Sequence, residues 1–264
     1  MVKHVLIIFL TFLIIPLHAA DISDLSYDTI GDTVIITDCE TSATGELIIP
    51  DTIGGKPVTS IGRSAFYNCS SLTSITLPDS AISIGSSAFT DCDNLMSITF
   101  GKNSKLTSIG QMAFWRCTSL TNITFGKNSK LTSIGINAFY SCESLKSIII
   151  PDGVTSIEES AFDSCVNLTS ITIPDGVNSI GKKTFNYCKS LEILTIPDSV
   201  KIIGLGAFAK CLSLNNVTFL GDAPIVGEDI FEYSNPPTIF RKPDTKGWGD
   251  TWGGRPVKLI TEKP

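Results

Sequence analysis

Residues 154–174 read VTSIEESAFDSCVNLTSITIP, and edited copies of this stretch recur from Ile61 to Phe231. Each copy is marked by a Phe, and all but the last carry a Cys three residues after it. The cysteines are spaced by 23 or 25 residues and are Cys69, Cys92, Cys117, Cys142, Cys165, Cys188 and Cys211. A fixed period of this length predicts a solenoid, in which each copy forms one turn of a stack.

A single copy shows how such a turn would be built. Within residues 168–173, Ile171 and Ile173 alternate with Ser170 and Thr172, which predicts a short strand with one inward face. Pro174 ends that strand because it has no N–H group to donate. Residues 177–180 predict a second short strand. Residues 182–188 predict about two turns of α-helix or 3₁₀-helix, with Phe and Cys at i and i+3 on the inward face.

One turn has nowhere to bury its apolar side chains when it is alone. Each of about six such side chains stabilises by roughly 1.5–3 kcal/mol when fully buried. Ordering about 23 residues costs at least as much, so an isolated turn is expected to be unfolded. Stacked turns bury one continuous core. The sequence therefore predicts an α/β solenoid of about eight repeats, whose parallel strands are joined by right-handed crossovers.

The LxxIxIP strand followed by VTSIGxxAFxxCxxL resembles the BspA-type leucine-rich repeat family over about Pro57 to Phe231. The resemblance implies a leucine-rich-repeat solenoid with a parallel β-sheet on the concave face and short strands and short helical turns on the other side. It also implies a secreted or surface-exposed protein. Some relatives bind host matrix glycoproteins, while most have no assigned partner. The chain departs from the pattern at Glu158, at Thr184 and at residues 205–206.

The first residues predict export. Lys3 and His4 form a short basic start, residues 5–17 are apolar, and Ala19 or Ala20 offers a cleavage point. The apolar run is short for a membrane span and no later segment qualifies, so no span is expected in the mature chain. A retained membrane anchor is the alternative. The expected localisation is secreted or cell-surface.

Solenoids need atypical ends to cover the exposed core. Residues 33–36 and 46–49 predict two strands around a polar turn at the N-terminal end. At the other end, Trp248 or Trp252 is expected to cover the last repeat. The predicted domains are a signal peptide at 1–20, an N-terminal β cap at 21–56, leucine-rich repeats at 57–234 and a C-terminal cap at 235–264.

The composition argues against several classes of function. The chain has 26 acidic and 20 basic residues, and this balance disfavours nucleic acid and anionic membranes as partners. Its two histidines, His4 and His18, lie in the predicted signal peptide, so the mature chain has none for catalysis or metal binding. No enzyme activity, cofactor or metal is therefore expected. Paired carboxylates can hydrolyse glycosides, but no pair stands apart from the repeat pattern.

Two columns of equivalent residues have alternative interpretations. The seven repeat cysteines would point in parallel, which favours buried thiols over disulfides or a metal site. Cys39, in the N-terminal cap, falls outside this column. Asp152, Asp175 and Asp198 each follow a Pro. They either form a calcium ladder or serve as ordinary turn residues, and turn chemistry is favoured.

Two surfaces are candidates for binding. Residues 101–105 and 126–130 both read GKNSK, and stacking would gather their lysines on one edge of an acidic protein. A basic edge suits an acidic partner, although exposed lysines often only keep a loop solvated. The outward strand residues form rows rich in Ser and Thr, which also reflects β-propensity. The candidate binding residues are Lys102, Lys105, Lys127, Lys130, Thr99, Thr124, Thr172 and Thr195.

Trp115 and Tyr140 follow Ala-Phe in neighbouring repeats, and they form either a contact site or partly buried packing. The sequence as a whole favours an exported binding or adhesion module for a protein or glycan partner. A structural envelope or matrix protein without a specific ligand is the alternative. A glycan-acting enzyme is the third interpretation.

Overall fold

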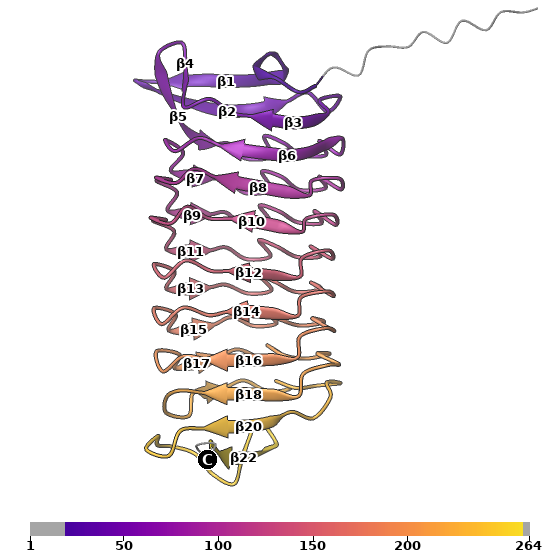
Figure 1. The fold of residues 1–264 in the computed structure, drawn as a ribbon, viewed down its shortest axis with the longest axis vertical. Helices are drawn as coiled ribbons and strands as arrows, with labels where there is room; N and C mark the ends of the chain where they lie inside the picture. The colour runs from indigo at the N-terminus through magenta and orange to yellow at the C-terminus, as the bar shows by residue number, and fades with distance from the viewer. Residues whose placement is uncertain (1–18, 261–264) are drawn as a thin grey trace, which may run out of the picture.

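The computed structural model describes residues 19–260, so the expected signal peptide lies outside the described residues except for its last two. Figure 1 shows turns of chain stacked above one another in a nearly straight column. Each turn contributes one strand to a side of longer strands, called here the long-strand side, and one strand to a sheet of shorter strands, the short-strand sheet. The described part of the chain has one short helix, the 3₁₀ segment η1 at Ile22–Asp24.

The long-strand side holds parallel strands at equivalent positions of successive turns. For example, Ser97, Ile98 and Thr99 of β8 pair with Asn122, Ile123 and Thr124 of β10. Its strands are β3 (Gly45–Ile48), β6 (Leu72–Leu77), β8 (Ser97–Phe100), β10 (Asn122–Thr124), β12 (Ser147–Ile149), β14 (Ser170–Thr172), β16 (Ile193–Ile196), β18 (Asn216–Phe219), β20 (Thr238–Arg241) and β22 (Arg255–Leu259).

The short-strand sheet runs unbroken along the stack. Its strands are β1 (Leu25–Ile30), β2 (Thr33–Cys39), β5 (Lys56–Ile61), β7 (Ser83–Ile84), β9 (Ser108–Ile109), β11 (Ser133–Ile134), β13 (Ser156–Ile157), β15 (Ser179–Ile180), β17 (Ile202–Ile203) and β19 (Ile225–Val226), with β4 (Thr52–Ile53) paired to β5. The β1–β2 and β4–β5 pairs are antiparallel, and the other pairs are parallel.

The prediction of about eight repeats is wrong, because the stack has about nine turns. The sequence count used the Phe markers, and the first turn has none. That turn contains β3, where Leu47 and Ile49 are buried like the strand residues of later repeats. β2 and β3, expected as neighbours around a polar turn, lie in different sheets: β2 pairs with β5, and β3 pairs with β6.

The predicted helical turns are also wrong, so the α/β class must be replaced by a β-solenoid. The amide of Trp115 closes a local turn onto Met112 O at 3.1 Å, but its neighbours Phe114 and Arg116 donate to the next turn of the stack. A helix would use every one of these amides within its own segment. Met112 and Arg116 have φ values of 56° and 58°, which also excludes a right-handed helix.

The core is a column of phenylalanine rings. Successive rings stack with centroids 4.8–5.9 Å apart, from Phe66 to Phe231. All eight cysteines are buried and free. In six of them Sγ lies 3.0–3.2 Å from the carbonyl oxygen of the Phe in the preceding turn. Burial raises the pKa of Cys211 to about 12, so the thiol stays protonated and can donate.

Both ends of the stack differ from its middle. At the N-terminal end, β1 folds back on β2 and borders the short-strand sheet. At the C-terminal end, Trp252 is buried, packs edge-on against Phe219 at 4.7 Å, and donates from Nε1 to the carbonyl oxygen of Pro224 at 3.2 Å. Trp248 packs beside it on the same Phe219. Both tryptophans therefore lie against the end of the core.

Candidate functional site

The two GKNSK loops lie on adjacent turns and are built alike. The amide of Ser104 donates to Gly101 O at 3.1 Å, and the amide of Ser129 donates to Gly126 O at 3.0 Å. The loops are in direct contact, since a side chain at Gly126 would collide with the carbonyl oxygen of Gly101. All four loop lysines are exposed. No ion pair joins any of them to an acidic group among residues 19–260.

The first loop is fixed to the turn before it. The carboxylate of Asp79 accepts from the amide of Asn103 at 3.2 Å, and the carbonyl oxygen of Asp79 accepts from the amide of Lys105 at 3.0 Å. The second loop lacks such a bond to the following turn, because no described hydrogen bond joins residues 126–130 to Asp152. The loop pair is therefore hydrogen-bonded to the turn before it, but no described hydrogen bond joins it to Asp152 in the turn after it.

The candidate threonines are all exposed, but they do not form one continuous row. Thr99 and Thr124 are paired on β8 and β10. Thr172 pairs with Ile149, whose side chain is 77% exposed and interrupts the hydroxyl row. Thr195 lies beyond this point and pairs with Thr218. Exposed Ile149 thus divides the predicted binding residues into two groups.

The long-strand side divides into three sheets, with breaks between β10 and β12 and between β14 and β16. β10 ends a four-stranded sheet and β12 begins a two-stranded one. The residue before each strand usually donates to the turn before it, as Thr121 does to Met96 O at 2.9 Å and Thr169 to Lys146 O at 2.9 Å. Within the described chain, the amide of Lys146 makes no such bond to Thr121. The edges of β10 and β12 therefore face each other unpaired.

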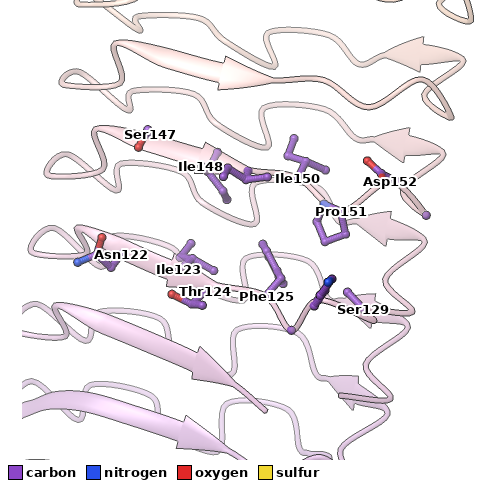
Figure 2. A pocket seen from close by; sticks show the side chains of 14 residues that line it. Asn122, Ile123, Thr124, Phe125, Ser129, Ser147, Ile148, Ile150, Pro151 and Asp152 are labelled. Atoms are coloured by element: carbon purple, nitrogen blue, oxygen red, sulfur yellow. The ribbon is translucent and has the colours of Figure 1, made fainter. Parts of the chain in front are cut away.

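A crevice of about 500 Å³ occupies the break between β10 and β12. Figure 2 shows it between the strand carrying Asn122 and Thr124 and the strand carrying Ser147. Ile123 is only half-buried here, although Ile98 and Ile148, at the equivalent positions of the preceding and following turns, are buried. Further lining comes from Phe125, Gly126, Lys127, Ser129, Ile149, Ile150, Pro151, Asp152 and Gly153. We call this space the β10–β12 crevice.

The structure thus brings together only part of the predicted site. Lys127 and Thr124 line the β10–β12 crevice, while Thr172 and Thr195 do not. Sequence reasoning missed the crevice itself. A signal was present, because here a GKNSK loop is followed by the shorter PDGV turn at 151–154. An Ile at position 149 also stands where most repeats have Thr.

The comparisons with known proteins agree with this architecture. The BspA type Leucine rich repeat region matches residues 43–131 and 127–237, in six copies. The chain belongs to this family. No curated protein matches the chain. The BspA-type family and its fold are those of repeat proteins that are generally not enzymes.

Solved structures of bacterial leucine-rich repeat proteins are similar to this BspA-type chain. A leucine-rich repeat protein of T. pallidum is 32% identical, with a TM-score of 0.68, covering 75% of this chain and 91% of the other. One from Bacteroides ovatus is 23% identical, with a TM-score of 0.62 and coverages of 90% and 75%, which supports the fold alone. A leucine-rich cell surface protein of Faecalibacterium prausnitzii is 26% identical, with a TM-score of 0.50 and coverages of 79% and 72%.

The structure also shows how the other residues singled out in the sequence lie. Trp115 and Tyr140 stack on each other, with centroids 4.1 Å apart and an interplanar angle of 10°. Asp152 and Asp175 are exposed turn residues. Across residues 19–260, no three His, Cys, Asp or Glu side chains gather as a metal site would require. The same residues include no helix of the length and apolarity needed to cross a membrane.

Proposed function

We propose that this chain is an exported binding module that holds a protein or glycan partner at the cell surface or outside the cell. Family membership supports a repeat-based binding or surface module. The predicted signal peptide supports export, as does similarity to a protein described as a cell surface protein. A solenoid offers a long lateral face to a partner.

The observation that carries this proposal is the pair of contacting GKNSK loops. They place four exposed lysines, without ion-pair partners in the described chain, on one edge of a protein whose formal net charge is −6. Complementary charge mainly sets partner choice and association rate. The basic edge therefore favours an acidic partner.

The test uses the mature chain from residue 21 onwards. It is immobilised and exposed to matrix glycoproteins and to two acidic polysaccharides, hyaluronan and heparin. We expect saturable binding that weakens with salt, since exposed charges are screened. Changing Lys102, Lys105, Lys127 and Lys130 together to Glu is expected to abolish it.

The matched control changes four other exposed lysines to Glu: Lys201, Lys242, Lys246 and Lys258. This control alters the net charge equally and is expected to retain most of the binding. Equal loss in both variants would remove the basic edge from the proposal. Absence of saturable binding to every probe would instead favour a structural envelope or matrix protein.

A further inference from the structure

We propose that the β10–β12 crevice is a subsite for an acidic sugar residue, meaning a pyranose ring that bears a carboxylate within a glycan chain. The inference rests on the proposed function, because it names the ligand class of the same basic edge. The volume of the crevice, about 500 Å³, lies within the range of small-molecule pockets, which runs from about 300 to 1,000 Å³.

The width of the crevice excludes an inserted peptide strand. Unpaired strand edges usually invite a third strand by β-augmentation. A strand between β10 and β12 would hold them about 9.6 Å apart, which is two spacings of roughly 4.8 Å. Cα atoms of β10 and β12 instead come within 8 Å of each other. The space therefore suits a ligand seated at its mouth rather than a strand threaded through it.

The floor of the crevice is apolar. Phe125 stacks on Phe100 with centroids 5.1 Å apart, so one face of its ring is covered by the preceding turn. The next turn has Ile150 instead of a third ring, and Phe125 is only half-buried. Figure 2 shows Phe125 beside Ile123 and facing the turn of Ile150 and Pro151. A partly exposed aromatic ring next to an aliphatic side chain suits the C–H face of a pyranose.

The walls of the crevice are polar and mostly uncharged. Asn122, Thr124, Ser129 and Ser147 contribute amide and hydroxyl groups. The unpaired edges of β10 and β12 add backbone donors and acceptors. Hydroxyl groups of a sugar are both donors and acceptors, so they can pair with this mixed set in place of water.

One cation selects an acidic sugar over a neutral one. Lys127 lines the crevice and makes no ion pair with the acidic groups of residues 19–260. A carboxylate on the ring would form a charge-assisted hydrogen bond with its ammonium group. Asp152 on the opposite wall can accept from ring hydroxyls, whereas it would repel a second nearby carboxylate. Isolated carboxylates on spaced rings therefore suit the crevice better than a continuous acidic peptide.

The experiment measures binding of three probes to the mature chain by calorimetry. They are a hyaluronan tetrasaccharide, the same tetrasaccharide with its carboxyl groups reduced to alcohols, and a hexaglutamate peptide. We expect the acidic tetrasaccharide to bind about tenfold more tightly than its reduced form, as one charge-assisted hydrogen bond allows. Hexaglutamate is expected to bind more weakly than the acidic tetrasaccharide.

Two variants that each replace a Thr by Trp test whether the ligand binds in the crevice. Thr124→Trp fills the crevice, whereas Thr195→Trp puts the same side chain at the equivalent strand position outside it. We expect Thr124→Trp to weaken the acidic tetrasaccharide at least about tenfold and Thr195→Trp to change it less than about twofold, because only the first blocks the contact surface. Lys127→Ala is expected to weaken the acidic form but not the reduced form.

Three outcomes would overturn the subsite. These are equal affinity for the acidic and reduced tetrasaccharides, equal effects of the two Trp variants, or tighter binding of hexaglutamate. If long acidic polymers still bind and the four-lysine variant still loses them, the proposed function survives while the subsite fails. Unfolding curves of both Trp variants must match that of the unchanged chain, which separates lost binding from lost folding.

Discussion

The Sγ atom of Cys142 lies 3.2 Å from the carbonyl oxygen of Phe114, which belongs to the preceding turn of the stack. Both residues are fully buried. The same carbonyl oxygen accepts from the amide of Cys117 at 3.3 Å, so the thiol supplies its second hydrogen bond. At the last repeat, Ser234 takes the place of Cys, and its hydroxyl donates to Phe208 O at 2.6 Å. This position in the repeat therefore favours a small side chain with one hydrogen-bond donor.

The first prediction concerns this donor. Cys142→Ala removes the thiol donor but leaves Phe114 O its hydrogen bond from the amide of Cys117, so we expect a loss of about 0.5–1.5 kcal/mol in the free energy of unfolding. Cys142→Ser keeps a donor and is expected to cost less than Cys142→Ala. Urea unfolding of the two variants provides the measurement. A serine variant as unstable as the alanine variant would show that packing, and not the hydrogen bond, explains the column.

The second prediction is a loss of stability in alkali. The pKa of Cys211 rises from its ordinary value of 9.0 to about 12 through burial. Above about pH 9 the unfolded chain releases thiol protons that the native chain retains, so the free energy of unfolding falls as pH increases towards 12. Denaturant unfolding between pH 8 and 11 measures this slope, and Cys211→Ser is expected to reduce it. Identical slopes in both proteins would contradict the assignment.

Thiol reactivity tests the same burial independently. A thiol reagent is expected to react slowly with the native chain at pH 8, because the eight cysteines are buried and free. After denaturation without reductant, all eight should react. A disulfide between Cys117 and Cys142, detected by mass spectrometry, would show that the column is bonded rather than reduced.

The third prediction concerns the aromatic column. Phe139 is fully buried between Phe114 and Phe162, at centroid distances of 5.1 and 5.2 Å. Phe139→Ala is expected to cost about 3–5 kcal/mol, because it opens a cavity shared with both neighbouring turns. The exposed change Thr172→Ala should cost less than about 1 kcal/mol. Comparable losses in equilibrium unfolding would mean that the inward and outward faces are assigned wrongly.

The repeat pattern predicted the core but not the path of the backbone between strands. Phe139 and Cys142 were expected on one inward face, and both are buried. A helical turn was the simplest conformation that puts i and i+3 together, but a loop with positive φ at Asn137 and Ser141 does so as well. Local sequence favours neither strongly. The lateral hydrogen bonds to the next turn decide the outcome, and they exist only once the turns are stacked.

The candidate site was predictable only in part for a related reason. Lys127 was identified because the GKNSK loops differ from the other turns, and Thr124 because it belongs to an outward row of Thr residues. The β10–β12 crevice depends on how a GKNSK loop meets an unlike turn, and the other such junction is bridged by Asp79. Whether two neighbouring turns pair or separate is a property of their contact. A single repeat read by itself does not contain this information.

The last prediction concerns a buried carboxylate on the side of the stack that carries Trp115 and Tyr140. Asp163 is only 5% exposed. Its two oxygens each accept from Asn186 Nδ2 at 3.0 Å, and Ser164 Oγ donates to Oδ1 at 2.9 Å. Burial raises the pKa of Asp163 above its ordinary value, against the opposing effect of these hydrogen bonds and of Lys183 and Lys210.

The sign of the resulting pH dependence follows from that direction. A raised native pKa means that the native chain binds the proton more tightly than the unfolded chain, so stability is lost as pH rises above about 4 through the native pKa. Asp163→Asn keeps an acceptor for Asn186 and removes the buried charge. We therefore expect the variant to gain stability relative to the unchanged chain between pH 4 and pH 7, measured by urea unfolding at each pH. Asp175→Asn, at an exposed turn, corrects for the loss of one negative charge. A stability difference that stays constant with pH, or that reverses in sign, would show that Asp163 is ionised in the native chain at no cost.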